Sequence, residues 1–242
     1  MRLLVVLFLI FLSSEINAQA AVLEHELLIK SVDHQNTQFQ EFVNIRAPLY
    51  NGSAYIKYWN KVLGHPYFIS DQFKSADINY QNFLYRNIPL KYDIMKNQLI
   101  ILNASKEFEM AIINNYVSEF KIDNHFFIKI NHDSIHVYNP GQGFYELLYN
   151  GNSSVIVKYF KRVEASLKAE DNTSSFIAYD KYFVFANNEY HEVEKISDYF
   201  SLHIDQKGQL KKYMRKEKLN FSKNPAKALV SLAAYFDTIS HE

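Results

Sequence analysis

Residues 118–130 read SEFKIDNHFFIKI, and this stretch predicts how the larger part of the chain folds. It holds two short runs rich in aromatic and apolar residues, Ser118–Ile122 and His125–Ile130, which are separated only by Asp123-Asn124. Runs of this length and composition, joined by a two-residue turn, are typical of two antiparallel strands in a β-hairpin. The stretch therefore predicts an antiparallel sheet that is built from consecutive hairpins.

The same pattern recurs on both sides of this hairpin. Short runs rich in Tyr, Phe, Ile and Val are separated by Asn-Gly, Asn-Asn and Pro-Gly pairs, at close to the 8–12 residues expected of all-β folds. The other runs that we interpret as strands are Ala54–Trp59, Ile78–Tyr80, Phe83–Tyr85, Leu90–Tyr92, Gln98–Asn103, Phe108–Ile112, Ser134–Tyr138, Phe144–Tyr149, Ser154–Phe160, Ser175–Asp180 and Tyr182–Ala186.

The last fifth of the chain has a helical period instead. Leu210, Tyr213 and Met214 stand at positions i, i+3 and i+4 and form one apolar stripe. Asn224-Pro225 predicts the start of the last helix, with Asn as the N-cap and Pro in the first turn. The apolar face of that helix continues through Leu229, Leu232, Phe236 and Ile239.

The first twenty residues have the layout of a secretory signal peptide. A short basic start is followed by the apolar run Leu3–Leu12, and Ala18-Gln19-Ala20 offers small residues for cleavage after Ala20 or Ala18. The run is too short for an ordinary transmembrane helix, and the remaining sequence holds no apolar stretch of about 18 residues. We therefore expect an exported protein, in the periplasm or at the outer cell surface, with no transmembrane span after the signal is removed.

These patterns predict an α+β fold that is mainly β, with helices at the C-terminus. The expected organisation is a signal peptide over residues 1–20, an antiparallel β-meander over 21–190, and a helical segment over 191–242 that packs on the sheet. The meander would form a curved sheet or a half-barrel. Two or three short helices would follow it, the first capped by Ser197.

Composition excludes several classes of protein. The chain has no cysteine, which excludes a disulfide framework, thiolate chemistry and a lipid anchor on an N-terminal Cys. The 26 basic and 26 acidic side chains balance, which argues against a nucleic-acid partner. Basic residues do gather at Lys207–Lys218. We interpret this segment as a solvated helix that docks on the sheet, with contact to an anionic membrane surface as the alternative.

Histidines are the nearest approach to a metal site. His125, His132 and His136 stand on neighbouring predicted strands, and imidazole suits zinc or copper. Their spacing matches no ligand motif, however, and Asp133 is the only carboxylate nearby. We therefore interpret them as solvated hairpin histidines, and we predict no metal and no cofactor.

Other polar residues have structural interpretations that outweigh catalytic ones. His65 lies in a loop that we expect to place Tyr67 and Phe68 in the core rather than to supply a general base. Asp93 is expected to close a turn toward Lys96. Glu146 alternates with apolar neighbours, so we expect it to point away from them, toward solvent or a cross-strand Lys. No catalytic residue is predicted.

Two interpretations are open for the aromatic residues Tyr58, Trp59 and Tyr67. They could form a face on which a sugar or a peptide stacks, but aromatic residues at this density more often fill a core. We favour the core and keep the ligand platform as the alternative.

Three segments of the chain have distinctive motifs. The first is Leu90-Lys91-Tyr92-Asp93-Ile94 with Tyr80 and Leu99-Ile100, the second is the hairpin over 143–151, GFYELLYNG, and the third comprises 210–220 and 229–235. Together they resemble an uncharacterised family of secreted or periplasmic β-rich proteins from Bacteroidota. The resemblance covers most of residues 45–240. It implies a location in the envelope of a Gram-negative cell, and it implies no activity and no catalytic residue.

We predict a non-enzymatic binding or scaffolding protein of the cell envelope, whose partner is an envelope protein, a glycan or a lipid. The alternative is a carrier that holds a lipid or an acyl chain between the sheet and a helix. An outer-membrane barrel is a third hypothesis, and the predicted C-terminal helix argues against it. An enzyme with an active site assembled from scattered residues is a fourth.

Overall fold

The computed structural model describes residues 48–58, 62–131, 140–165 and 173–240. The chain divides into two compact units, Met1–Tyr50 and Asn51–Glu242. The first unit contributes one described element, the 3-10 helix η1 (Pro48–Tyr50), and the second contains the sheet and the helices.

Several sequence predictions fall outside the described residues. They are the signal peptide over 1–20, the strand Ser134–Tyr138, and the side chains of Trp59, His132 and His136.

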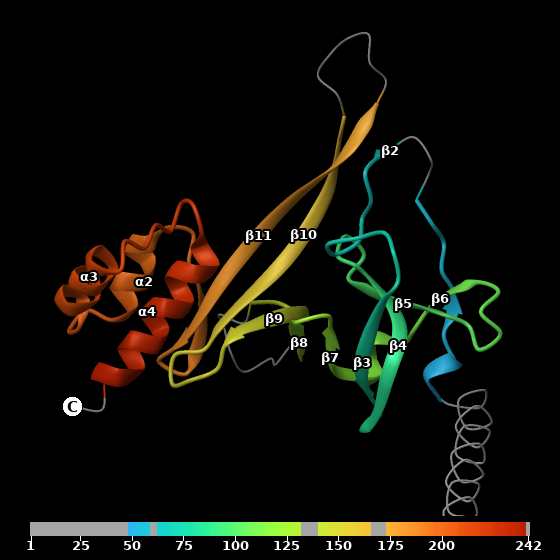
Figure 1. Cartoon of the computed structure of the whole chain (residues 1–242), viewed down its shortest axis with the longest axis horizontal. Helices are drawn as coiled ribbons and strands as arrows, with labels where there is room; N and C mark the ends of the chain where they lie inside the picture. The colour runs from blue at the N-terminus through green and yellow to red at the C-terminus, as the bar shows by residue number, and fades with distance from the viewer. Residues whose placement is uncertain (1–47, 59–61, 132–139, 166–172, 241–242) are drawn as a thin grey trace, which may run out of the picture. The chain divides into compact units, whose positions relative to one another are not determined.

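Twelve strands of the second unit form one sheet (Figure 1). Their order across the sheet is β1-β6-β5-β4-β3-β7-β8-β9-β10-β11-β12, and β2 pairs with β11 beside this path. The β2–β11 pairing is parallel and the other pairings are antiparallel. The strands are β1 (Ser53–Ala54), β2 (Val62–Leu63), β3 (Lys74–Tyr80), β4 (Phe83–Asp93), β5 (Gln98–Leu102), β6 (Glu109–Ala111), β7 (Val117–Ile122), β8 (His125–Ile130), β9 (Gly143–Tyr149), β10 (Val155–Ala165), β11 (Ser174–Ala186) and β12 (Glu189–Glu192).

The predicted fold class is confirmed: the protein is mainly β, with a large curved sheet that does not close and with C-terminal helices. The predicted meander is interrupted at three places, because β1 pairs with β6, β2 pairs with β11, and β7 pairs with β3. After β6, the 3-10 helix η2 (Asn114–Tyr116) leads the chain back to β7, which pairs with β3. This crossover follows from pairing, because the hairpins from β3 to β6 extend from one edge of β3 and leave its other edge free for β7.

Some predicted strands are longer or shorter in the structure. Phe83–Tyr85 and Leu90–Tyr92 belong to one strand, β4, whose register shifts near Asn87, a residue with a φ of 55°. Asn and Pro are common in turns, but Asn87 and Pro89 lie within β4, close to the point where its pairing with β3 shifts register. A strand can continue through such a bulge. The strand predicted over Ala54–Trp59 ends at Ala54.

The three described helices pack on one end of the sheet. They are α2 (Ile196–Leu202), α3 (Lys207–Lys216) and α4 (Pro225–Ile239). Leu229 and Leu232 of α4 form a buried cluster with Val155 of β10 and Val184 of β11. Burial of each of these side chains contributes roughly 1.5–3 kcal/mol, and this burial attaches the helices to the sheet.

The starts of two helices test the predicted caps. Asn224 is the N-cap of α4, as predicted, and its Oδ1 accepts a hydrogen bond from the backbone N–H of Lys227 at 2.9 Å. The predicted cap of α2 was wrong, because the N-cap is Lys195 and not Ser197. Asp198 replaces the missing side-chain cap, since its carboxylate accepts the backbone N–H of Lys195 at 3.0 Å.

Candidate functional site

A short irregular segment, residues 64–73, connects two distant parts of the sheet, and we call it the strap. Tyr67 forms an antiparallel bridge with Asp93 at the end of β4. On the other side, Lys161 of β10 donates its Nζ hydrogens to the carbonyl oxygens of His65 and Tyr67, at 2.8 Å each. Burial lowers the pKa of Lys161, although the nearby charge of Asp93 opposes this. The strap therefore lies between β4 and β10.

The ring of Phe68 anchors the strap on the inner face of the sheet, which we define as the face that carries Phe120 and Phe127. Phe68 is 7% exposed, and its ring contacts Phe127 at 5.1 Å and Tyr159 at 4.8 Å between centroids. The cluster of rings around it, the inner aromatic cluster, comprises Phe68, Tyr92, Phe120, Phe127, Phe144 and Tyr159. The predicted placement of Tyr67 and Phe68 in the core is confirmed.

The residue after Phe68 has a strained backbone. Ile69 has a φ of 55°, in the left-handed region, and its side chain is 59% exposed. A β-branched residue in this region costs of the order of 1–2 kcal/mol, because its Cβ approaches the following carbonyl. The strap is therefore held on the sheet by Phe68 at the cost of strain in Ile69.

A buried carboxylate lies beside the inner aromatic cluster. Glu146 of β9 is 6% exposed, and its two oxygens accept hydrogen bonds from His125 Nδ1 at 2.7 Å and from the Tyr159 hydroxyl at 2.5 Å. Burial, together with the bond to Glu146, raises the pKa of Tyr159, so the hydroxyl stays a proton donor. Burial and the charge of Glu146 also raise the pKa of Asp180.

The structure corrects one prediction about these residues and limits another. Glu146 lies on the face opposite Tyr145, as alternation requires, but that face is covered rather than solvated. The hairpin histidine His125 is solvated only in part: its side chain is 34% exposed, while its ring packs edge-on against Phe68 at 5.0 Å and its Nδ1 contacts Glu146. Both oxygens of Glu146 are engaged within the chain, so we interpret this group as a structural hydrogen-bond network.

Asp93 closes a turn, as predicted, and it also binds two tyrosine hydroxyls. Its Oδ1 accepts the backbone N–H groups of Met95 and Lys96, at 2.9 Å each. Its carboxylate also accepts hydrogen bonds from the hydroxyls of Tyr55 at 2.7 Å and Tyr58 at 3.3 Å. Tyr58 is thus directed into the protein, which favours the core interpretation over a stacking platform at this residue.

The turn between β3 and β4 forms one wall of a surface cleft, which we call the amide cleft. Gln81 and Asn82 form this two-residue turn with φ values of 52° and 66°, as a type I′ hairpin turn requires. Tyr116 of η2 forms the opposite wall, and its carbonyl oxygen accepts the backbone N–H of Gln81 at 2.8 Å. The cleft has a volume of about 310 Å³, and its lining consists of Gln81, Asn82, Asn115, Tyr116, Val117, Ser118, Lys129 and Asn131.

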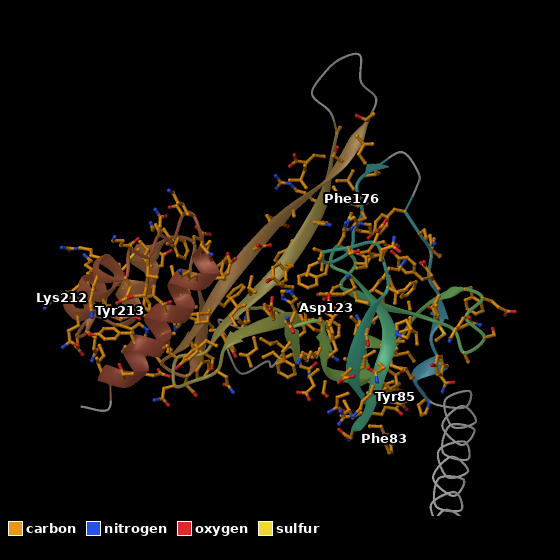
Figure 2. All side chains as sticks on the ribbon, in the orientation of Figure 1. Phe83, Tyr85, Asp123, Phe176, Lys212 and Tyr213 are labelled. Atoms are coloured by element: carbon orange, nitrogen blue, oxygen red, sulfur yellow. The ribbon has the colours of Figure 1, made fainter. Side chains whose placement is uncertain are left out.

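Most polar side chains of the amide cleft are available to a ligand. Those of Gln81, Asn82 and Asn115 are exposed and make no hydrogen bond to another described residue. Tyr116 is 46% exposed, and Phe83, which follows Asn82 in the chain, lies at the tip of the β3–β4 hairpin (Figure 2). The Nζ of Lys129 donates to the Asn114 carbonyl at 3.0 Å, and burial lowers its pKa.

A second cleft lies at the β1–β6 edge of the sheet. It has a volume of about 610 Å³ and is lined by Ala54, Tyr55, Lys57, Leu102, Glu107, Phe108 and Glu109. Glu109 is committed within the chain, since it pairs with Lys91 at 2.7 Å and Lys57 at 3.1 Å. Burial alone would raise the pKa of Glu109, but the bonds from these two lysines outweigh it and lower that pKa. Of the two carboxylates in this cleft, Glu109 is therefore paired with lysines, while the exposed Glu107 accepts a hydrogen bond from the Ser105 hydroxyl at 2.7 Å.

In the part of the chain that the structure describes, no group of three or more His, Asp or Glu side chains has the arrangement of a metal site. Within those same ranges, no helix combines the length and the apolar character that crossing a membrane requires.

Comparison with known proteins found no matching family model, no matching curated protein and no matching solved structure. The resemblance to the secreted proteins of Bacteroidota therefore stays a prediction.

Sequence reasoning missed the amide cleft. Its walls come from the β3–β4 turn and from η2, which the crossover brings together. Asn and Gln are ordinary residues in turns, so their presence gave no signal of a site. The positive φ values of Gln81 and Asn82 are a conformational requirement of the hairpin, and they say nothing of a ligand.

Proposed function

We propose that the protein is a non-enzymatic binding protein of the cell envelope, and that the amide cleft binds a polyhydroxylated ligand such as a segment of envelope glycan. The observation that carries this proposal is that the exposed amides of Gln81, Asn82 and Asn115 are unengaged and line the same cleft as the exposed ring of Tyr116. The cell envelope is the proposed location because the predicted signal peptide would export the protein.

The chemistry of the lining supports a glycan. Each amide side chain both donates and accepts hydrogen bonds, which suits neighbouring hydroxyl groups on a sugar ring. The face of Tyr116 offers an apolar surface, and a few directed polar groups around such a surface are the usual composition of a ligand site. The described lining residues include no carboxylate, whereas glycoside hydrolysis ordinarily uses a pair of them. The lining therefore favours binding without turnover.

Calorimetry of the purified chain with soluble fragments of envelope glycans tests the proposal. We expect Asn115→Ala and Tyr116→Ala each to weaken binding about tenfold, since each removes a contact worth of the order of 1 kcal/mol. Tyr179→Ala is the matched control, because Tyr179 is a tyrosine on β11 with a similar exposure, 41% against 46% for Tyr116. Equal losses in all three variants, or release of cleaved sugar by the unmodified chain, would contradict the proposal.

The strap favours a second candidate function, a carrier of an apolar chain. Phe68 inserts one ring into the inner aromatic cluster from a segment with a strained backbone at Ile69. Strain of this kind persists only where the surroundings enforce it, and it clusters at ligand clamps. An acyl chain could replace the Phe68 ring and release the strain.

Native mass spectrometry of protein isolated from its own host distinguishes the two functions. A carrier shows an added mass that organic solvent removes, and Phe68→Ala increases the occupied fraction because it vacates the space of one ring. A bare chain mass for both proteins excludes the carrier and leaves the glycan proposal intact.

A further inference from the structure

The outer face of α3 carries an unusual concentration of positive charge. Residues 207–218 contain six basic side chains and one acid, Glu217, in a chain whose formal net charge is zero. All six are exposed, and no ion pair joins any of them to a carboxylate among the described residues. They are Lys207, Lys211, Lys212, Arg215, Lys216 and Lys218.

The basic residues and the apolar residues of α3 lie on opposite sides of the helix. At 3.6 residues per turn, the five basic residues within α3 fall on one half of its surface, opposite Leu210, Tyr213 and Met214. The apolar half is already used: Leu210 is fully buried, and the ring of Tyr213 stacks on Tyr235 of α4 at 4.1 Å. Figure 2 shows Lys212 at the outer edge of the helices. Only the basic half of α3 is available to a partner.

We propose that this basic face of α3 docks the protein on the surface of an anionic lipid bilayer. The proposal goes beyond ligand binding at the amide cleft, because it uses a different element and a different kind of partner.

The composition of the face indicates a lipid surface rather than a shaped polyanion. Five of the six cations are lysines, which act as hydrated point charges and need no fixed geometry, whereas recognition of individual phosphates favours the planar fork of arginine. Clusters of 4–8 basic residues on an amphipathic helix are typical of attachment to anionic lipids. Ile204, 73% exposed just before α3, adds one apolar side chain that a bilayer interface can accept.

Because the apolar half of α3 is committed to the protein core, docking depends on charge and not on insertion of the helix. The expected attachment is therefore peripheral, reversible and weakened by salt, since the Debye length falls from about 10 Å at 0.1 M to about 3 Å at 1 M.

Sedimentation of the purified full chain with lipid vesicles tests the proposal. We expect binding to vesicles of phosphatidylglycerol and phosphatidylcholine in equal parts, and little binding to phosphatidylcholine alone. The triple variant Lys207→Gln, Lys211→Gln, Lys212→Gln should weaken binding to the anionic vesicles by on the order of a hundredfold, at about 1 kcal/mol per charge near the surface.

A matched control removes the same charge elsewhere. Arg86→Gln, Lys106→Gln and Lys121→Gln change three exposed cations outside the helices, and this variant should bind as the unmodified chain does. All three proteins share residues 1–20, so apolar binding by that segment is the same in each; it is measured on phosphatidylcholine vesicles and subtracted from the binding to the anionic ones. Equal loss in the two variants, equal binding to both kinds of vesicle, or binding to heparin without binding to vesicles would each overturn the proposal. Thermal melting confirms that both variants fold.

Discussion

The carboxylate of Asp237 in α4 accepts a hydrogen bond from the hydroxyl of Tyr149 in β9, with 2.9 Å between the oxygens. The same carboxylate accepts the backbone N–H groups of Asn152 at 2.9 Å and Ser153 at 3.2 Å. One side chain of the last helix therefore holds both the end of β9 and the turn that leads into β10. This contact fixes the position of α4 on the sheet in addition to the apolar cluster.

We expect Asp237→Ala to lower the free energy of unfolding by about 2 kcal/mol, because hydrogen bonds to a charged group are each worth about 1.5–3 kcal/mol and water compensates part of the loss. Urea unfolding followed by circular dichroism measures it. Asp205→Ala, at an exposed carboxylate between α2 and α3, should change the stability by less than about 0.5 kcal/mol. Equal effects of the two changes would contradict the role of Asp237.

Gly151 is required by this contact. A Cβ at this position would collide with Oδ2 of Asp237 and with the ring of Tyr149. Gly151→Ala should therefore destabilise the protein by about 1–3 kcal/mol, the usual cost of overpacking. Gly208→Ala is the matched control, since a Cβ there would have open space within 4 Å and alanine favours a helix by about 1 kcal/mol. The two substitutions should shift the thermal midpoint in opposite directions.

His203 should make stability depend on pH. It is 6% exposed, its ring lies 3.9 Å from that of Phe236, and its Nε2 has no hydrogen-bond partner in the described structure. Burial lowers its pKa from 6.5 to about 4, although the charge of Asp237 opposes this. Between these two values the unfolded chain binds the proton and the folded chain does not, so stability is full above pH 6.5 and falls as the pH drops toward 4.

Between pH 6.5 and pH 4, the free energy of unfolding should fall by up to about 3 kcal/mol. Urea unfolding at a series of pH values measures it, and His203→Phe is the control that keeps a ring but removes the titrating group. The slope between pH 4 and 6.5 should decrease in this variant. An unchanged slope would show that other groups cause the dependence.

Phe68→Ala should cost about 3–5 kcal/mol, the usual range for a buried aromatic ring. Phe83→Ala is the comparison, because Phe83 is two-thirds exposed and its loss should cost less than about 0.5 kcal/mol. Chemical unfolding of both variants measures the difference. If Phe68→Ala is as mild as Phe83→Ala, the inner aromatic cluster does not need the strap.

Ile69→Gly should stabilise the protein by about 1 kcal/mol. Glycine has no Cβ, so it adopts the left-handed region without steric strain, and the exposed Ile69 side chain contributes little burial that could be lost. The greater conformational freedom of glycine in the unfolded chain reduces this stabilisation. Ile56→Gly, at another exposed isoleucine without a positive φ, should not stabilise. Differential scanning calorimetry detects a difference of this size.

The sequence predicted the fold class because alternation, turn pairs and helical spacing are local signals. The hairpin over 118–130 and the Asn224-Pro225 start of α4 are both as expected. Glu146 shows the limit of such reasoning: alternation assigns its face, but the burial of that face depends on the strap, which approaches from a distant part of the chain.

The amide cleft depends on tertiary structure in the same way. Gln81 and Tyr116 meet because β7 pairs with β3, and no local pattern encodes that pairing. The basic face of α3 is the opposite case, since its charge and its period are visible in the sequence. The structure adds that Leu210 and Tyr213 are already packed, so the apolar half of α3 is not available for insertion.

The two bonds from Lys161 to the strap also bear on how the chain folds in time. They join residues that are 96 and 94 positions apart, while most strand pairs of the sheet join neighbours in the chain. Closing so long a loop is entropically costly before its contacts form, so hairpins should assemble first and the strap should dock last. Substitution of Lys161 should then speed unfolding and leave the folding rate nearly unchanged.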